Sequence, residues 1–170
     1  MNERWSKKIV ALHWVSAALL VGLVIVGTVM VGLPADEPLR RVLGRVHSLT
    51  GVTLGFLTLV RLVVRLRGTS PAPIPLAPLH RKGAAFIQGL IYAGLFGMGV
   101  TGVATAYRSN WHAYIDGADP SPVFEGLLSR QVHGVLVIGL VLLVGAHVIG
   151  VLVQQVRKGG TLRRVLPFLK

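Results

Sequence analysis

The sequence predicts an all-α integral membrane protein, a single bundle of four transmembrane helices. Hydrophobic residues make up 52% of the 170 residues and charged residues only 14%, which is too apolar for a soluble domain of this length. Four apolar segments are each long enough to cross a bilayer. The Lys and Arg residues lie mostly between these segments and not on one soluble face, so the net charge of +12 does not indicate a nucleic-acid partner.

The four predicted helices span roughly residues 9–33, 46–66, 84–107 and 131–156 of one membrane domain, residues 1–170. Each approaches or exceeds the ~20 residues that a transmembrane helix needs. The first segment is too long for a signal peptide and follows basic residues, as an uncleaved anchor does. Residues 67–83 are predicted to form a Pro-rich loop on one side of the membrane, and residues 108–130 a longer loop on the other.

Basic residues predict how the helices are oriented. Thirteen of the 18 Lys and Arg residues lie on the side of the two termini and the Pro-rich loop, whereas five of the six acidic residues lie on the opposite side. Because cytoplasmic loops carry an excess of Lys and Arg, both termini are predicted to be cytoplasmic. The loop 108–130 is then periplasmic, and the protein is predicted to be a multi-pass protein of a bacterial inner membrane.

Four histidines lie in or at the ends of the apolar segments, where ionisable side chains are costly and usually functional. His133 and His147 are fourteen residues apart on one predicted helix, so they share a face and lie about 21 Å apart along its axis. His13 and His47 lie at the starts of the first and second helices. The predicted helix directions place His13 at the depth of His147, near the inner surface, and His47 at the depth of His133, near the outer surface.

Two imidazole pairs at two depths match the ligands of two haem b groups, because bis-His ligation from facing helices favours electron transfer over oxygen binding. The chain has no cysteine, which excludes thiolate-held clusters and covalent c-type haem attachment. Basic residues near the helix ends are candidates to pair with haem propionates. They are Arg45 and Arg130 for the outer haem, and Arg4, Lys7 and Arg157 for the inner haem.

Other interpretations of the histidines remain open from the residues alone. Any one of the four is more often an interfacial polar residue than a ligand. A zinc site would normally gather its ligands closer together, whereas a proton relay through the four side chains is an alternative. A haem-free transporter or channel is a further alternative, against which the lack of an inverted repeat in the sequence argues.

Short motifs along nearly the whole chain resemble the bacterial cytochrome b561 family, the four-helix dihaem b-type cytochromes of the inner membrane. The family's first two ligand motifs are similar to RWSKKIVALHW, which contains His13, and to RVHSLTG, which contains His47 and Gly51. The last two ligands correspond to His133 and His147 in QVHGVLVIGLVLLVGAH, at the family's spacing. Further similarity lies in RLVVRLR followed by PAPIP, and in the tail GGTLRRVLPF.

The resemblance implies an oxidoreductase that transfers electrons between the quinone pool, with ubiquinol or ubiquinone as substrate, and a one-electron partner. Some members oxidise superoxide and pass the electrons to ubiquinone, and others serve as haem-bearing anchors that relay electrons for a periplasmic redox enzyme. Family members often have His where this chain has Gln88, Gln154 and Gln155, which leaves the iron ligands intact but puts a quinone site or proton path at the inner end in doubt.

Two histidines are not assigned to iron. His80 is predicted to be a solvated loop residue. His112 lies beside Trp111 in the outer loop, where it is a candidate to accept a proton from a quinol.

Overall fold

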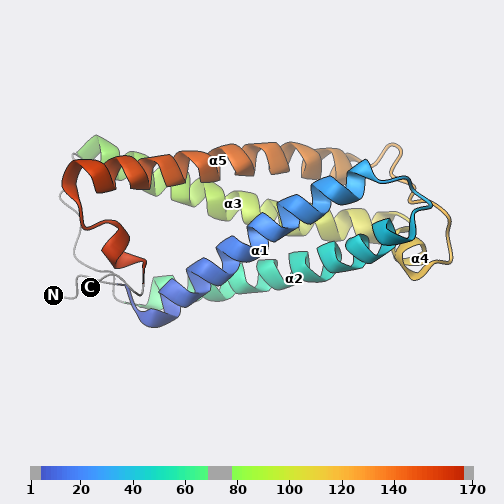
Figure 1. The fold of residues 1–170 in the computed structure, drawn as a ribbon, viewed down its shortest axis with the longest axis horizontal. Helices are drawn as coiled ribbons and strands as arrows, with labels where there is room; N and C mark the ends of the chain where they lie inside the picture. The colour runs from blue at the N-terminus through green and yellow to red at the C-terminus, as the bar shows by residue number, and fades with distance from the viewer. Residues whose placement is uncertain (1–4, 69–77, 167–170) are drawn as a thin grey trace.

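A computed structural model describes residues 5–68 and 78–166. Over these residues its regular secondary structure consists of helices joined by turns and loops (Figure 1). Four long helices dominate it: α1 (Lys7–Gly32), α2 (Pro38–Arg67), α3 (Pro78–Arg108) and α5 (Leu128–Lys158). Each contains an apolar window of membrane-spanning length and hydropathy. The predicted fold class, an all-α membrane protein with four spanning helices, is therefore confirmed.

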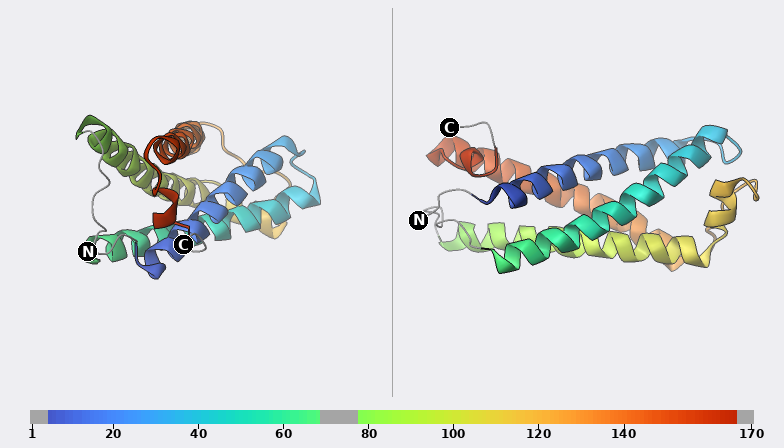
Figure 2. Two further views of the ribbon diagram at one scale, coloured as in Figure 1. Left: turned by 60° about the vertical axis from the view of Figure 1, so that its left-hand side comes forward. Right: turned by 90° about the horizontal axis from the view of Figure 1, so that it is seen from below.

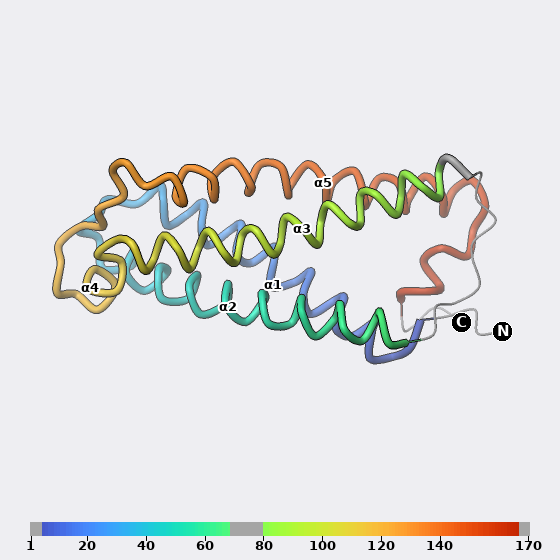
Figure 3. The backbone as a smooth tube through the Cα atoms, turned by 180° about the vertical axis from the view of Figure 1, so that it is seen from behind, coloured from blue at the N-terminus to red at the C-terminus, as the bar shows by residue number. Residues whose placement is uncertain are grey.

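The four helices alternate in direction and form two closely packed pairs. α1 packs along α2, and α3 packs along α5 (Figures 1 and 3). The two pairs meet mainly through α2 and α3, whereas α5 makes few close backbone contacts with α1 or α2. Two further views show how the helices cross (Figure 2). The predicted ligands of each pair therefore come from helices of different packed pairs.

The two ends of the bundle differ. We call the end at which α1 begins and α5 ends the terminal end, and the opposite end, which carries the short helix α4 (Trp111–Asp116), the α4 end (Figure 1). His13 lies six residues after the start of α1, and His147 lies in the second half of α5, so both are toward the terminal end. His47 and His133 lie in the first halves of α2 and α5, toward the α4 end.

An apolar layer lies between these two levels. Leu54, Leu95 and Leu140 are buried together, and further leucines of α1 pack against them. Leu54 lies seven residues after His47, and Leu140 lies midway between His133 and His147. Seven residues are about two helical turns, or about 10 Å, so these leucines occupy the same helix faces as the histidines. The layer therefore separates the two histidine levels by closely packed side chains.

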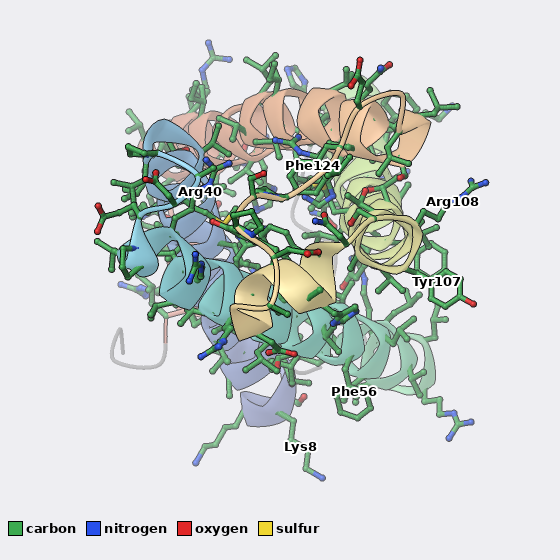
Figure 4. All side chains as sticks on the ribbon, turned by 90° about the vertical axis from the view of Figure 1, so that its right-hand side faces the viewer. Lys8, Arg40, Phe56, Tyr107, Arg108 and Phe124 are labelled. Atoms are coloured by element: carbon green, nitrogen blue, oxygen red, sulfur yellow. The ribbon has the colours of Figure 1, made fainter. Side chains whose placement is uncertain are left out.

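Most other large apolar side chains point outward, as a lipid-facing surface requires. Phe56, for example, is 65% exposed and points away from the bundle, as do Tyr107 and Arg108 near the α4 end (Figure 4).

The helices are longer than the hydrophobic segments that the sequence predicted. α2 begins at Pro38 and not near residue 46, because proline is favoured in the first helical turn and the polar residues that follow can be helical outside the hydrocarbon. α3 likewise begins at Pro78, which makes His80 an exposed helix residue instead of a loop residue. Hydropathy locates the part of a helix inside the bilayer, not its full length. The prolines at 71, 73 and 75 lie outside the described residues.

The predicted outer loop contains α4, which closes the α4 end of the bundle (Figure 4). Trp111, Tyr114 and Ile115 are buried on its inner face, and Phe124 packs against them. The indole N–H of Trp111 donates a hydrogen bond to Ser48 Oγ (2.9 Å), and the Tyr114 hydroxyl donates one to the Ala35 carbonyl (2.8 Å). These bonds attach α4 to α2 and to the turn before it.

The segment after α5 folds back at the terminal end. Gly159 and Gly160 both have positive φ angles, of 70° and 73°, which let the chain turn sharply before the 3₁₀ helix η1 (Leu162–Arg164). Trp14 Nε1 on α1 donates a 2.7 Å hydrogen bond to the Val165 carbonyl, and the Leu162 N–H donates to Gln155 Oε1 (3.0 Å). Gln155 therefore has a structural role in holding this segment.

Candidate functional site

His47 and His133 face each other between α2 and α5. Their ring centres are 6.4 Å apart, and their ring planes differ by 67°. Two metal–nitrogen bonds of about 2 Å each, together with about 1 Å from each nitrogen to its ring centre, place two imidazoles that share one metal about 6 Å apart. Two imidazoles that ligate one metal from opposite sides can take any rotation relative to each other, so the 67° between these ring planes is compatible with shared ligation. The spacing and tilt of this pair therefore fit bis-imidazole ligation of one haem.

Two glycines allow the imidazoles of this outer pair to lie close to the neighbouring helices. A Cβ atom on Gly27 of α1 would lie 3.1 Å from Cε1 of His47 and 3.4 Å from its Nδ1. A Cβ atom on Gly102 of α3 would lie 3.3 Å from Cε1 of His133. Each ring thus lies close to the backbone of a neighbouring helix. Side chains at positions 27 and 102 would require the rings or the helices to move.

Thr101 on α3 fixes the orientation of His133. Its hydroxyl donates a 2.7 Å hydrogen bond to the Gly97 carbonyl and lies 3.1 Å from Nδ1 of His133. Because the single hydroxyl proton is used in the bond to Gly97, the Thr101 oxygen accepts a hydrogen bond that Nδ1–H of His133 donates. Nε2 of His133 then carries the lone pair that a metal needs. A second partner of this kind is typical of histidines that bind metals.

The inner pair, His13 and His147, lies one level toward the terminal end. The charge of His147 on α5 acts on His13 on α1, which puts the two side chains in the same region of the bundle. Nδ1 of His13 is buried without a hydrogen-bond partner, as is Nδ1 of His47 in the outer pair. At Nδ1, these two imidazoles therefore lack the kind of second partner that Thr101 gives to His133.

Each pair has one arginine close to it. Arg130 on α5 interacts electrostatically with His47 and His133, and Arg61 on α2 does so with His13 and His147. Arg130 was expected at the outer pair from the sequence, whereas Arg61 was not expected at the inner one. The available signal was its spacing, because Arg61 follows His47 by the same fourteen residues that separate His147 from His133.

Of the other basic residues that the sequence suggested as propionate partners, those that the structure describes have no interaction with the histidine pairs. Arg45 lies 4.0 Å from Asp116 of α4, and both side chains are more than half exposed. Lys7 and Arg157 are exposed, and Arg4 lies outside the described residues. His112 is exposed on α4, beside the buried Trp111.

The described residues contain no group of three or more His, Cys, Asp or Glu side chains that could hold a metal ion together. The four histidines are brought together two at a time, with the leucine layer between the pairs. This arrangement defines a helical membrane protein with two stacked two-histidine sites.

The chain matches the family model described as prokaryotic cytochrome b561 over residues 4–168, and it therefore belongs to this family. A search of curated proteins gave no match. The family is one of haem b membrane proteins with a redox function. Together with the four apolar helices, membership makes this chain a multi-pass bacterial membrane protein of electron transfer.

Proposed function

We propose that the protein is a dihaem cytochrome of a bacterial inner membrane, with both termini in the cytoplasm. It carries electrons between the quinone pool and a one-electron partner at the periplasmic side. The observation that carries the proposal is the 6.4 Å spacing of the His47 and His133 rings. His147 lies on the same face of α5 as His133, one level toward the terminal end, with His13 on α1 as its proposed partner. Haem b supplies reversible one-electron chemistry at each level.

The chain's own residues position and insulate the two levels. His13 with His147 and His47 with His133 would each hold one haem b, and Thr101 holds His133 in the tautomer that leaves Nε2 free to ligate. The layer of Leu54, Leu95 and Leu140 excludes water between the levels and sets their separation. At the α4 end, Trp111 and Tyr114 are buried, and Trp111 donates a hydrogen bond to Ser48, the residue after His47. A partner on this side would therefore exchange electrons with the outer level at the α4 end.

Superoxide is the one-electron partner that we propose first, since Arg130 lies beside the outer pair and attracts anions. The alternative is a haem-bearing anchor that relays electrons for a periplasmic redox enzyme. Standalone turnover of ubiquinone with superoxide would support the first. Its absence, together with co-purification of a soluble redox partner, would support the second.

The decisive measurement is the haem content and absorption spectrum of the purified full-length protein, oxidised and dithionite-reduced. We expect two b haems per chain, both low-spin, and reduction by ubiquinol without dithionite. One haem per chain would mean that one histidine pair does not ligate. A colourless protein, made with ample haem supply, would refute the proposal and favour a transporter or proton relay.

Replacing Thr101 with valine is expected to weaken the outer site without changing its shape. Loss of a hydrogen bond to a ligating histidine typically costs about 10- to 100-fold in metal affinity or activity. The imidazole also becomes less basic, so the reduction potential of one haem should rise. Haem retention and a potentiometric titration measure both effects. Thr53→Val is the matched control, because the Thr53 hydroxyl makes the same bond to its own helix (2.9 Å, to Leu49) but is exposed.

A further inference from the structure

A cluster of polar side chains lies at the terminal end between α2 and α3. The guanidinium carbons of Arg61 and Arg65 lie 5.5 Å and 5.8 Å from the centre of the Tyr92 ring. Arg65 also donates a 3.0 Å hydrogen bond to the Gln88 side-chain carbonyl. α3 moves away from α2 toward this end (Figure 3). The contacts of Arg61 and Arg65 with Tyr92 and Gln88 connect the two helices there.

Within residues 5–68 and 78–166, which the structure describes, no carboxylate lies near the positive charge of this cluster. The acidic residues that the structure describes all lie at the α4 end, and the ion pair among them is that of Asp116 with Arg45. Arg61 and Arg65 are partly buried, and an arginine cannot relieve the cost of burial by losing its proton. The tyrosine ring compensates only part of this charge. An anionic group from outside the chain would complete the site.

Tyr92 provides a second, independent indication. Its hydroxyl is buried and has no hydrogen-bond partner. A buried hydroxyl without a hydrogen-bond partner costs free energy. A carboxylate oxygen would accept a hydrogen bond from it. The guanidinium groups and the phenol thus offer the donors that a carboxylate needs, and Arg61 is the member of the cluster that interacts with both His13 and His147.

We propose that Arg61 and Tyr92 bind a propionate carboxylate of the haem held by His13 and His147, with Arg65 steadied by Gln88 behind them. This proposal rests on the proposed dihaem function. It also assigns a role to Gln88, which holds an arginine in place at a position where a histidine was expected from the family resemblance. The same guanidinium keeps a fixed positive charge beside the inner level, which favours the reduced form of that haem.

The test is a potentiometric titration of full-length, haem-loaded Arg61→Gln, followed by its low-spin haem absorbance. We expect one of the two haem components to become harder to reduce. Its equilibrium constant for reduction should fall about tenfold, which is about 59 mV for a one-electron couple. Arg67→Gln is the matched control, because Arg67 is an exposed arginine at the end of the same helix, and it should leave both components unchanged. Arg130→Gln should shift the other component.

Two further variants keep the proposal testable if Arg61→Gln does not accumulate. Arg61→Lys retains the charge but loses the planar pair of donors, so a smaller shift of the same component is expected. Tyr92→Phe should shift that component alone and weaken retention of one haem.

Three results would overturn the assignment. The first is a wild-type protein with two haems and an Arg61→Gln variant with identical potentials and haem content. The second is an equal shift of both components in Arg61→Gln. The third is a change in the KM for ubiquinol without any change in either potential, which would assign the cluster to the quinone head group. A wild-type protein without two haems would instead refute the proposed function itself, and the carboxylate site with it.

Discussion

Replacing His133 with alanine is expected to reduce the haem content from two per chain to about one. His133 is one of two imidazoles at the outer level, and the 6.4 Å spacing to His47 matches two imidazoles that share one metal. Among the described residues, no third His, Cys, Asp or Glu side chain joins this pair. Alanine would remove one of the two proposed iron ligands and the contact with Thr101 at once. The remaining haem should be the low-spin haem of the inner pair, so the low-spin absorbance should fall by about half.

The same variant should abolish electron transfer across the membrane while leaving the inner level reducible. Dithionite should still reduce the remaining haem. Electron transfer between ubiquinol or ubiquinone and the one-electron partner, which needs both levels, should be lost. His80→Ala is the control, since His80 is exposed on α3 and belongs to neither pair. An unchanged haem content in His133→Ala would show that the facing histidines do not ligate iron. Loss of both haems would show that the two levels do not assemble independently.

The paired arrangement of histidines could be predicted because it depends on helix periodicity and direction alone. Fourteen residues return a side chain to nearly the same face, and alternating helices set the depths. The structure places the rings of His47 and His133 next to each other, as this reasoning requires. The choice of partners across the bundle therefore follows from sequence positions, without any knowledge of side-chain packing.

Two parts of the site could not be predicted, for different reasons. α4 has only six residues, and a helix of that length is not stable without tertiary contacts. It forms because Trp111 packs on Gly44, where a Cβ atom would lie 3.0 Å from the indole ring, and such contacts between distant segments have no local sequence pattern. A role for Arg61 beside the inner pair could not be predicted, because Lys and Arg are expected at helix ends for reasons of membrane orientation alone. Only its spacing from His47 distinguishes it from its neighbours.

Gly27 is the position where a small change should have a large effect on the outer site. A Cβ atom there would lie 3.1 Å from Cε1 of His47, so Gly27→Val must displace the imidazole or separate α1 from α2. Overpacking of this kind costs about 1–3 kcal/mol. If the strain falls on the ligating state, haem affinity at the outer level should fall by about tenfold to about a hundredfold. Haem retention during purification and titration of the apoprotein with haem measure this loss.

Gly22→Val on the same helix is the matched control, because a Cβ atom at Gly22 meets nothing within 4 Å. Both variants place the same β-branched side chain in α1, so any effect of helix propensity is shared. A loss confined to Gly27→Val would show that the glycine makes room for the His47 ring. Equal haem affinity in the two variants would show that α1 can shift away from α2 at little cost. The position of His47 would then be set by α5 and the haem, and not by its contact with α1.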